Sequence, residues 1–179
     1  GTKLALSSQT TELQDIDRAY ASNAIKTHVG DEENAFTRIL DFYSANHYLN
    51  QTILVELFTP SPCYLPMTSE RVFASLVESA YHLGHTVIIP AGNYPADVSL
   101  STRLSELSST SGLLSVGDFA QNSSQYILVG GAETYSLPFK VHSISNWDKN
   151  LVHLFAQAHN ILTTNRRDHD YNTTRNTSG

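Results

Sequence analysis

Apolar and polar residues follow a regular pattern along residues 126–162, which predicts three consecutive strands. Residues 126–129 form an unbroken apolar run that stops at two glycines, as in a central strand covered on both faces. Residues 139–143 and 152–158 alternate apolar with polar positions instead, which is the period of a half-buried strand. The turn-prone residues 146–150 separate these two strands, so we expect an antiparallel meander.

A tight turn between the last two of these strands sets their expected register. It would place Val141 beside Leu154, and His142 beside His153. A slip of one residue would oppose apolar to polar side chains along the whole hairpin, so the register should be well specified. Leu154 then faces the core, and we expect Leu154 and Val129 to be nearly fully buried.

The chain before this stretch predicts helices that cover the strands. Residues 15–29 form a weakly amphipathic helix candidate that ends at Gly30, and residues 31–46 form a second one. Residues 70–83 carry a stronger apolar stripe and are followed by Gly84, where a helix end favours glycine. The second candidate has one apolar face, made by Phe36, Ile39, Leu40 and Tyr43.

Two further strands flank the strongest helix candidate. Residues 52–58 and 85–89 are rich in aliphatic and β-branched side chains. The strand–helix–strand order favours parallel pairing of the two through a right-handed crossover. Residues 91–124 carry a weaker pattern, in which a short strand near Val98 and a short helix over residues 101–109 are the expected elements.

Together these elements predict an α/β (α+β) fold: a single domain with a mixed β-sheet and a C-terminal antiparallel meander covered by helices. We expect this domain to span residues 14–162. Residues 1–13 are polar, and residues 163–179 are charged and rich in Asn, so both are expected to be flexible segments.

Composition narrows the classes of function. The 179 residues carry a net charge of −6 and no basic block, which disfavours a nucleic-acid partner. The longest apolar runs have the length of strands, too short to cross a membrane. Cys63 is the single cysteine and cannot form an internal disulfide. We interpret it as a bystander in a Pro-rich loop, with a nucleophilic thiol as the alternative.

Eight histidines raise the question of a metal site. His82 and His85 flank a glycine at a helix end, so helical spacing does not hold both on one face. His142 and His153 would face each other across the predicted hairpin, with His159 further along, but a third ligand is not evident. No phosphate-binding glycine motif or nucleophile elbow occurs either. We therefore expect no cofactor, no bound metal and no enzymatic activity.

The polar face of the predicted hairpin is the candidate functional surface. It carries Phe155, and Trp147 lies at its end in the turn. Aromatic anchors within a polar surround are typical of a protein contact surface. The other predicted members of this surface are Lys140, His142, His153, Gln157 and His159. In the alternative interpretation, N-terminal helices cover this face and Phe155 belongs to the core.

Three of these patterns resemble the FlgO-like family of bacterial outer-membrane lipoproteins, which is related in plan to the CsgG-like and TolB N-terminal periplasmic domains. They are the helix at 70–83 with the strand after it, the run at 125–131, in which an aromatic and an aliphatic run precede glycine, and the hairpin at 139–161. The resemblance covers roughly residues 31–162. The turn at 146–150 lacks the usual glycine, and the family's lipid-bearing cysteine has no counterpart here.

The resemblance implies a non-enzymatic periplasmic component of an envelope-spanning machine, such as a flagellar outer ring, a secretion system or an export channel. Its partners would be other proteins of that machine and copies of itself, and the outer membrane would be reached only through a lipid anchor. Two other classes stay open. Scattered histidines motivate a small hydrolase or metal-dependent enzyme. An extracellular or viral surface glycoprotein domain is motivated by the sequons at Asn50, Asn122, Asn172 and Asn176.

Overall fold

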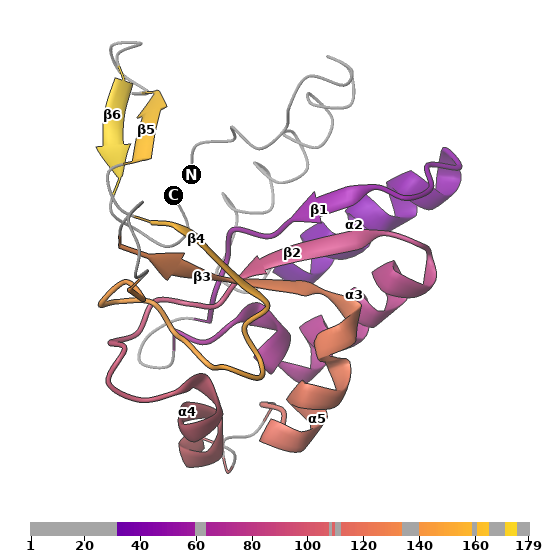
Figure 1. Ribbon diagram of the computed structural model, residues 1–179. Coiled ribbons are helices and arrows are strands. Elements are labelled where there is room, and N and C mark those ends of the chain that lie inside the picture. The colour runs from indigo at the N-terminus through magenta and orange to yellow at the C-terminus, as the bar shows by residue number, and fades with distance from the viewer. Residues whose placement is uncertain are drawn as a thin grey trace.

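The centre of the fold is a four-stranded sheet whose strands lie side by side in chain order (Figure 1). All three neighbouring pairs are parallel. The computed structural model describes residues 32–59, 64–107, 109, 112–133, 140–158, 161–164 and 171–174. The strands of the sheet are β1 (Thr52–Leu54), β2 (Thr86–Pro90), β3 (Ile127–Ala132) and β4 (Leu154–Gln157).

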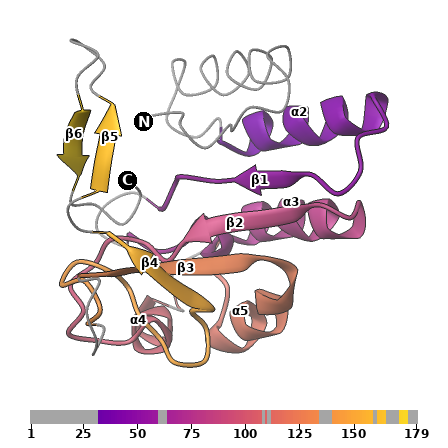
Figure 2. The same ribbon diagram turned by 45° about the horizontal axis from the view of Figure 1, so that its top comes forward.

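Helices supply the connections between the first three strands. β1 is joined to β2 through η1 and α3, and β2 is joined to β3 through α4, α5 and η2. In a sheet of sequential strand order, right-handed crossovers place the connecting helices on one face, and Figure 2 shows α3 behind β2. The helices are α2 (Glu32–Ala45), η1 (Met67–Ser69), α3 (Arg71–His82), α4 (Leu100–Leu107), α5 (Val116–Asn122) and η2 (Ser123–Gln125).

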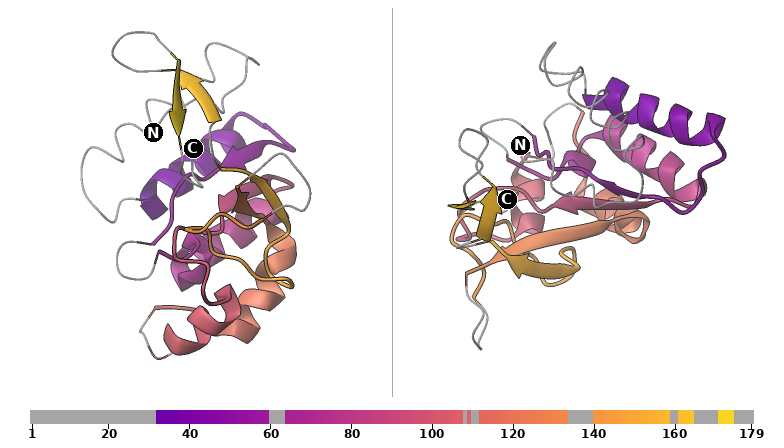
Figure 3. Two further views of the ribbon diagram at one scale, coloured as in Figure 1. Left: turned by 60° about the vertical axis from the view of Figure 1, so that its left-hand side comes forward. Right: turned by 90° about the horizontal axis from the view of Figure 1, so that it is seen from above.

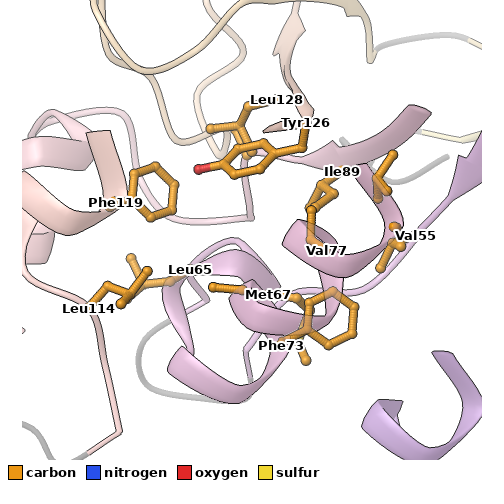
Figure 4. Close-up of a cluster of buried hydrophobic side chains, with 14 of the residues drawn as sticks. Val55, Leu65, Met67, Phe73, Val77, Ile89, Leu114, Phe119, Tyr126 and Leu128 are labelled. Atoms are coloured by element: carbon orange, nitrogen blue, oxygen red, sulfur yellow. The ribbon is translucent and has the colours of Figure 1, made fainter. Parts of the chain in front are cut away.

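The core lies between this helical layer and one face of the sheet. In the close-up of Figure 4, Ile89 and Leu128 of the strands stand opposite Val77 of α3, and all three side chains are fully buried. Burial of each such side chain stabilises the fold by about 1.5–3 kcal/mol. α2 extends the same layer, because the rings of Phe36 and Phe73 pack with their centroids 5.2 Å apart. The predicted helices at 31–46 and 70–83 are confirmed by α2 and α3.

Both of these helices end in the same backbone motif. At the end of α3, Gly84 has φ +82° and the His85 N–H donates to the Ala80 carbonyl at 2.9 Å. At the end of α2, His47 takes the same conformation with φ 57°, and the Tyr48 N–H donates to the Tyr43 carbonyl at 2.9 Å. These bonds satisfy carbonyls that a helix end leaves without partners. They also turn the chain directly into β1 and β2.

The predicted C-terminal antiparallel meander is wrong, and the sheet is parallel rather than mixed. β4 pairs with β3 in parallel, with Val129 opposite Leu154. Of residues 140–143, only Val141 forms a bridge, antiparallel to Ala132. The chain between β3 and β4 does not make a tight turn, because its polar side chains bind backbone groups at the end of the sheet, as described below.

The predicted phase of the last strand is wrong as well. Leu154 is 45% exposed and Val129 is only half-buried, whereas Phe155 lies against Gly130 on the helical side of the sheet. Alternation shows that two sets of side chains point to opposite faces. It does not show which of the two faces the helices cover.

Regular structure continues beyond Leu162, the predicted end of the domain. β5 (Ile161–Thr164) and β6 (Tyr171–Thr174) form a separate antiparallel sheet (Figure 3). The predicted domain limits themselves stay a prediction. The predicted flexible segment at 1–13, the helix candidate at 15–29 and Cys63 lie outside the described residues.

Candidate functional site

The connection between β3 and β4 closes the carboxyl end of the sheet. The Asn146 amide donates to the carbonyls of Tyr64 at 2.9 Å and Ala91 at 2.8 Å. The Ser145 hydroxyl accepts from the Gly131 N–H at 2.8 Å. Gly92 leaves room for this connection, because a Cβ there would overlap both the Tyr64 carbonyl and the Asn146 amide nitrogen that binds it. In open α/β sheets, ligands bind at this end where the strand order reverses. The order of these four strands does not reverse, and the connection between β3 and β4 occupies the carboxyl end of the sheet.

Asp148 joins this connection to the start of α4. Its carboxylate accepts from the backbone N–H groups of Ser101 at 3.1 Å, Asn150 at 2.8 Å and Leu151 at 3.3 Å. Burial alone would raise the pKa of Asp148, but these hydrogen bonds hold the pKa below its ordinary value. A carboxylate at a helix N-terminus is also favoured by the helix dipole. Asp148 therefore caps the N-terminus of α4, although it lies 47 residues away from Ser101 in the sequence.

Trp147 and His142 belong to the same connection and make hydrogen bonds within the protein. The Trp147 carbonyl accepts from the Leu100 N–H at 2.7 Å, and the indole N–H donates to the Ala96 carbonyl at 3.1 Å. Trp147 is half-buried and His142 is buried. The His142 N–H donates to the Gly131 carbonyl at 2.8 Å. Both side chains therefore help to pack the end of the sheet.

The remaining predicted contact residues are distributed along the edge of the sheet. His153 is exposed, and its Nδ1 accepts from the Leu128 N–H at 3.0 Å. Phe155 and Gln157 lie in β4, and Lys140 is exposed beside the Ala132–Val141 bridge. The predicted pairing of His142 with His153 is wrong, because β4 pairs with β3. His159 lies outside the described residues.

Within the described ranges, no three His, Cys, Asp or Glu side chains are grouped so that they could hold a metal ion. None of the helices described is both long and apolar enough to pass through a bilayer.

The second face of the sheet, opposite the helices, presents a continuous apolar row. Leu54 is 43% exposed and Leu154 is 45% exposed, and the residues between them are half-buried. The strand register aligns Leu54 with Ile88, Ile88 with Ile127, and Val129 with Leu154. We call this set the second-face row; its members are Leu54, Ile88, Ile127, Val129 and Leu154.

The second-face row was missed by sequence reasoning, although a signal for it exists. Residues 53–55, 87–89 and 127–129 are apolar at every position, so each strand carries apolar side chains on both faces. Such runs are typical of parallel sheets covered on both sides. Here the described helices occupy one side, and the row on the other side is partly exposed. No member of the row is charged.

Comparison of the chain with models of known protein families and with characterised proteins finds no match. The resemblance to the FlgO-like family stays a prediction. Function is therefore inferred from the surface itself.

Proposed function

We propose that this protein is a non-enzymatic component of an envelope-spanning machine in the periplasm, and that the second-face row is its contact with another protein subunit of that machine. The observation that carries the proposal is the partly exposed apolar row on a parallel sheet. Contiguous exposed apolar patches mark sites of interaction. The periplasmic setting comes from the resemblance to the FlgO-like family.

The chemistry of the row selects the kind of partner. Its exposed ends are leucines, and its centre is made of Ile88, Ile127 and Val129, so it has no charge or hydroxyl to offer a polar ligand. The apolar core of a protein interface has this composition. Full burial of a leucine is worth about 1.5–3 kcal/mol, and Leu54 and Leu154 are already more than half buried. A partner that covers what is still exposed therefore gains roughly 1 kcal/mol from each leucine, which contributes to a specific contact.

A pair of double variants tests the proposal. Leu54→Glu with Leu154→Glu places two charges at the ends of the row. The matched control is Val72→Glu with Tyr81→Glu, because these α3 side chains are also exposed, at 60% and 49%. We expect the row variant to lose incorporation into its envelope assembly, as measured by native gels of solubilised envelopes. The control should assemble like the parent protein.

Thermal melts separate loss of contact from loss of fold. Both double variants should melt within a few degrees of the parent protein, because all four positions are exposed. Assembly that survives in the row variant would contradict the proposed contact. A large fall in melting temperature confined to the row variant would show that the row is part of the protein's own core. Recovery of the native protein outside the periplasmic fraction would contradict the proposed setting.

A further inference from the structure

A small cavity lies at the amino ends of β1 and β2, where α2 and α3 end. Figure 1 shows these ends of the four elements on its right-hand side. The volume of the cavity is about 200 Å³. Buried Tyr43 and His85 line it from the protein side, and exposed Leu49 and Leu83 line it from the solvent side. It lies at the opposite end of the strands from the connection that carries Asn146 and Asp148, and none of its lining residues belongs to that connection or to the second-face row.

Aromatic rings make up the inner wall of this cavity. The Tyr43 and His85 ring centroids are 5.3 Å apart, and those of Tyr43 and Tyr48 are 6.2 Å apart with nearly perpendicular planes. Edge-to-face geometry of this kind is the preferred arrangement of packed rings. A further ring entering the cavity would meet the same kind of surface.

His85 adds one polar atom to this wall. Its side chain is buried, with 4% of the residue exposed, and its Nδ1 accepts from the Gln51 N–H at 3.2 Å. Burial lowers the pKa of His85, so the ring is neutral near pH 7 and its proton sits on Nε2. Nε2 has no hydrogen-bond partner among the described residues, and other protein atoms do not enclose it completely. It therefore presents an N–H donor to the cavity.

We propose that this cavity binds a small molecule consisting of one six-membered aromatic ring with an uncharged hydrogen-bond acceptor, of the class of the simple phenols. The ring would pack on Tyr43 and Tyr48, and its oxygen would accept from Nε2 of His85. Drug-sized ligands need cavities of roughly 300–1,000 Å³, so the volume limits the ligand to a single ring. No Lys or Arg lines the cavity, so a carboxylate would find no full positive charge there.

Two probes that differ by a single hydroxyl group test the role of His85. The intact chain, labelled with ¹⁵N, is titrated with p-cresol and with toluene, which lacks the hydroxyl group. We expect saturable amide shifts near residues 43–49 and 83–85, with a Kd for p-cresol roughly in the millimolar range. Toluene should bind about three- to tenfold more weakly, because it leaves the Nε2–H without an acceptor.

Two variants complete the test. His85→Phe keeps a ring and removes the donor, so p-cresol should lose its advantage over toluene. Because this change also removes the acceptor of the Gln51 N–H, a second variant is needed. Ser44→Trp changes an exposed helix position that borders the cavity and should abolish binding of both probes with the fold intact. Absence of saturable shifts, equal affinity for both probes, or unchanged binding to Ser44→Trp would each overturn the proposal.

Discussion

The ring of Phe155 lies over Gly130 of the neighbouring strand. The two residues are opposite each other in the parallel register of β3 and β4. A Cβ placed on Gly130 would come within 2.6 Å of Cδ1 of Phe155. The glycine therefore makes room for an aromatic side chain on the helical side of the sheet, where any larger residue would displace the ring.

Replacement of Gly130 by Ala should lower the free energy of unfolding by about 1–3 kcal/mol, because the methyl group displaces the Phe155 ring. In the Phe155→Ala background the same replacement should be nearly neutral, since the space is then empty. Urea unfolding of the two single variants and the double variant measures this coupling. Additive effects in the double variant would show that the ring does not depend on the glycine.

Shortening a leucine side chain to alanine should cost more stability on the helix-covered face of the sheet than on the second face. Leu128 is fully buried beneath the helices, whereas Leu154 is 45% exposed. Leu128→Ala should cost about 2–5 kcal/mol of stability, and Leu154→Ala less than about 1 kcal/mol. Equal costs in chemical denaturation would mean that the second face is as well covered as the first.

His47 holds a backbone conformation that suits glycine better. Its φ of 57° places it at the same position of the helix-ending motif that Gly84 occupies after α3. His47→Gly should therefore stabilise the protein by about 1 kcal/mol. The control is His82→Gly, within the last turn of α3, which should destabilise by about 0.5–1 kcal/mol. Melting temperatures that fall for both variants would contradict the strain at His47.

Asp148 should make the stability of the protein depend on pH at the acidic end. Its pKa in the folded state is lowered, so its contribution is present above the unfolded pKa of about 3.9 and is lost as the pH falls through the folded value. At pH 7, Asp148→Asn should cost about 1–3 kcal/mol. Urea unfolding between pH 7 and pH 3 should show this difference shrinking. A difference that stays constant with pH would mean that the carboxylate is not favoured in the folded state.

The elements with the strongest local signals were predicted correctly. α2 and α3 follow from apolar stripes at helical spacing, and α3 ends at His82, two residues before the glycine that was predicted to follow it. The parallel pairing of β1 with β2 follows from the order strand, helix, strand. These features depend on residues a few positions apart, or on the chirality of a single crossover, so the sequence alone contains them. The apolar run at 126–129 also predicted a strand with two apolar faces, which is part of the evidence for the second-face row.

The direction of β4 was decided by contacts between distant parts of the chain. Asn146 binds the carbonyl groups of Tyr64 and Ala91, 82 and 55 residues away in the sequence, and Asp148 binds Ser101, 47 residues away. These bonds hold the connection across the end of the sheet, so β4 enters parallel to β3 and not as the return strand of a hairpin. The alternation of side chains along β4 is the same whether this strand runs parallel or antiparallel to β3. Its orientation, and the exposure of the second-face row, follow only once those buried polar groups have found their backbone partners.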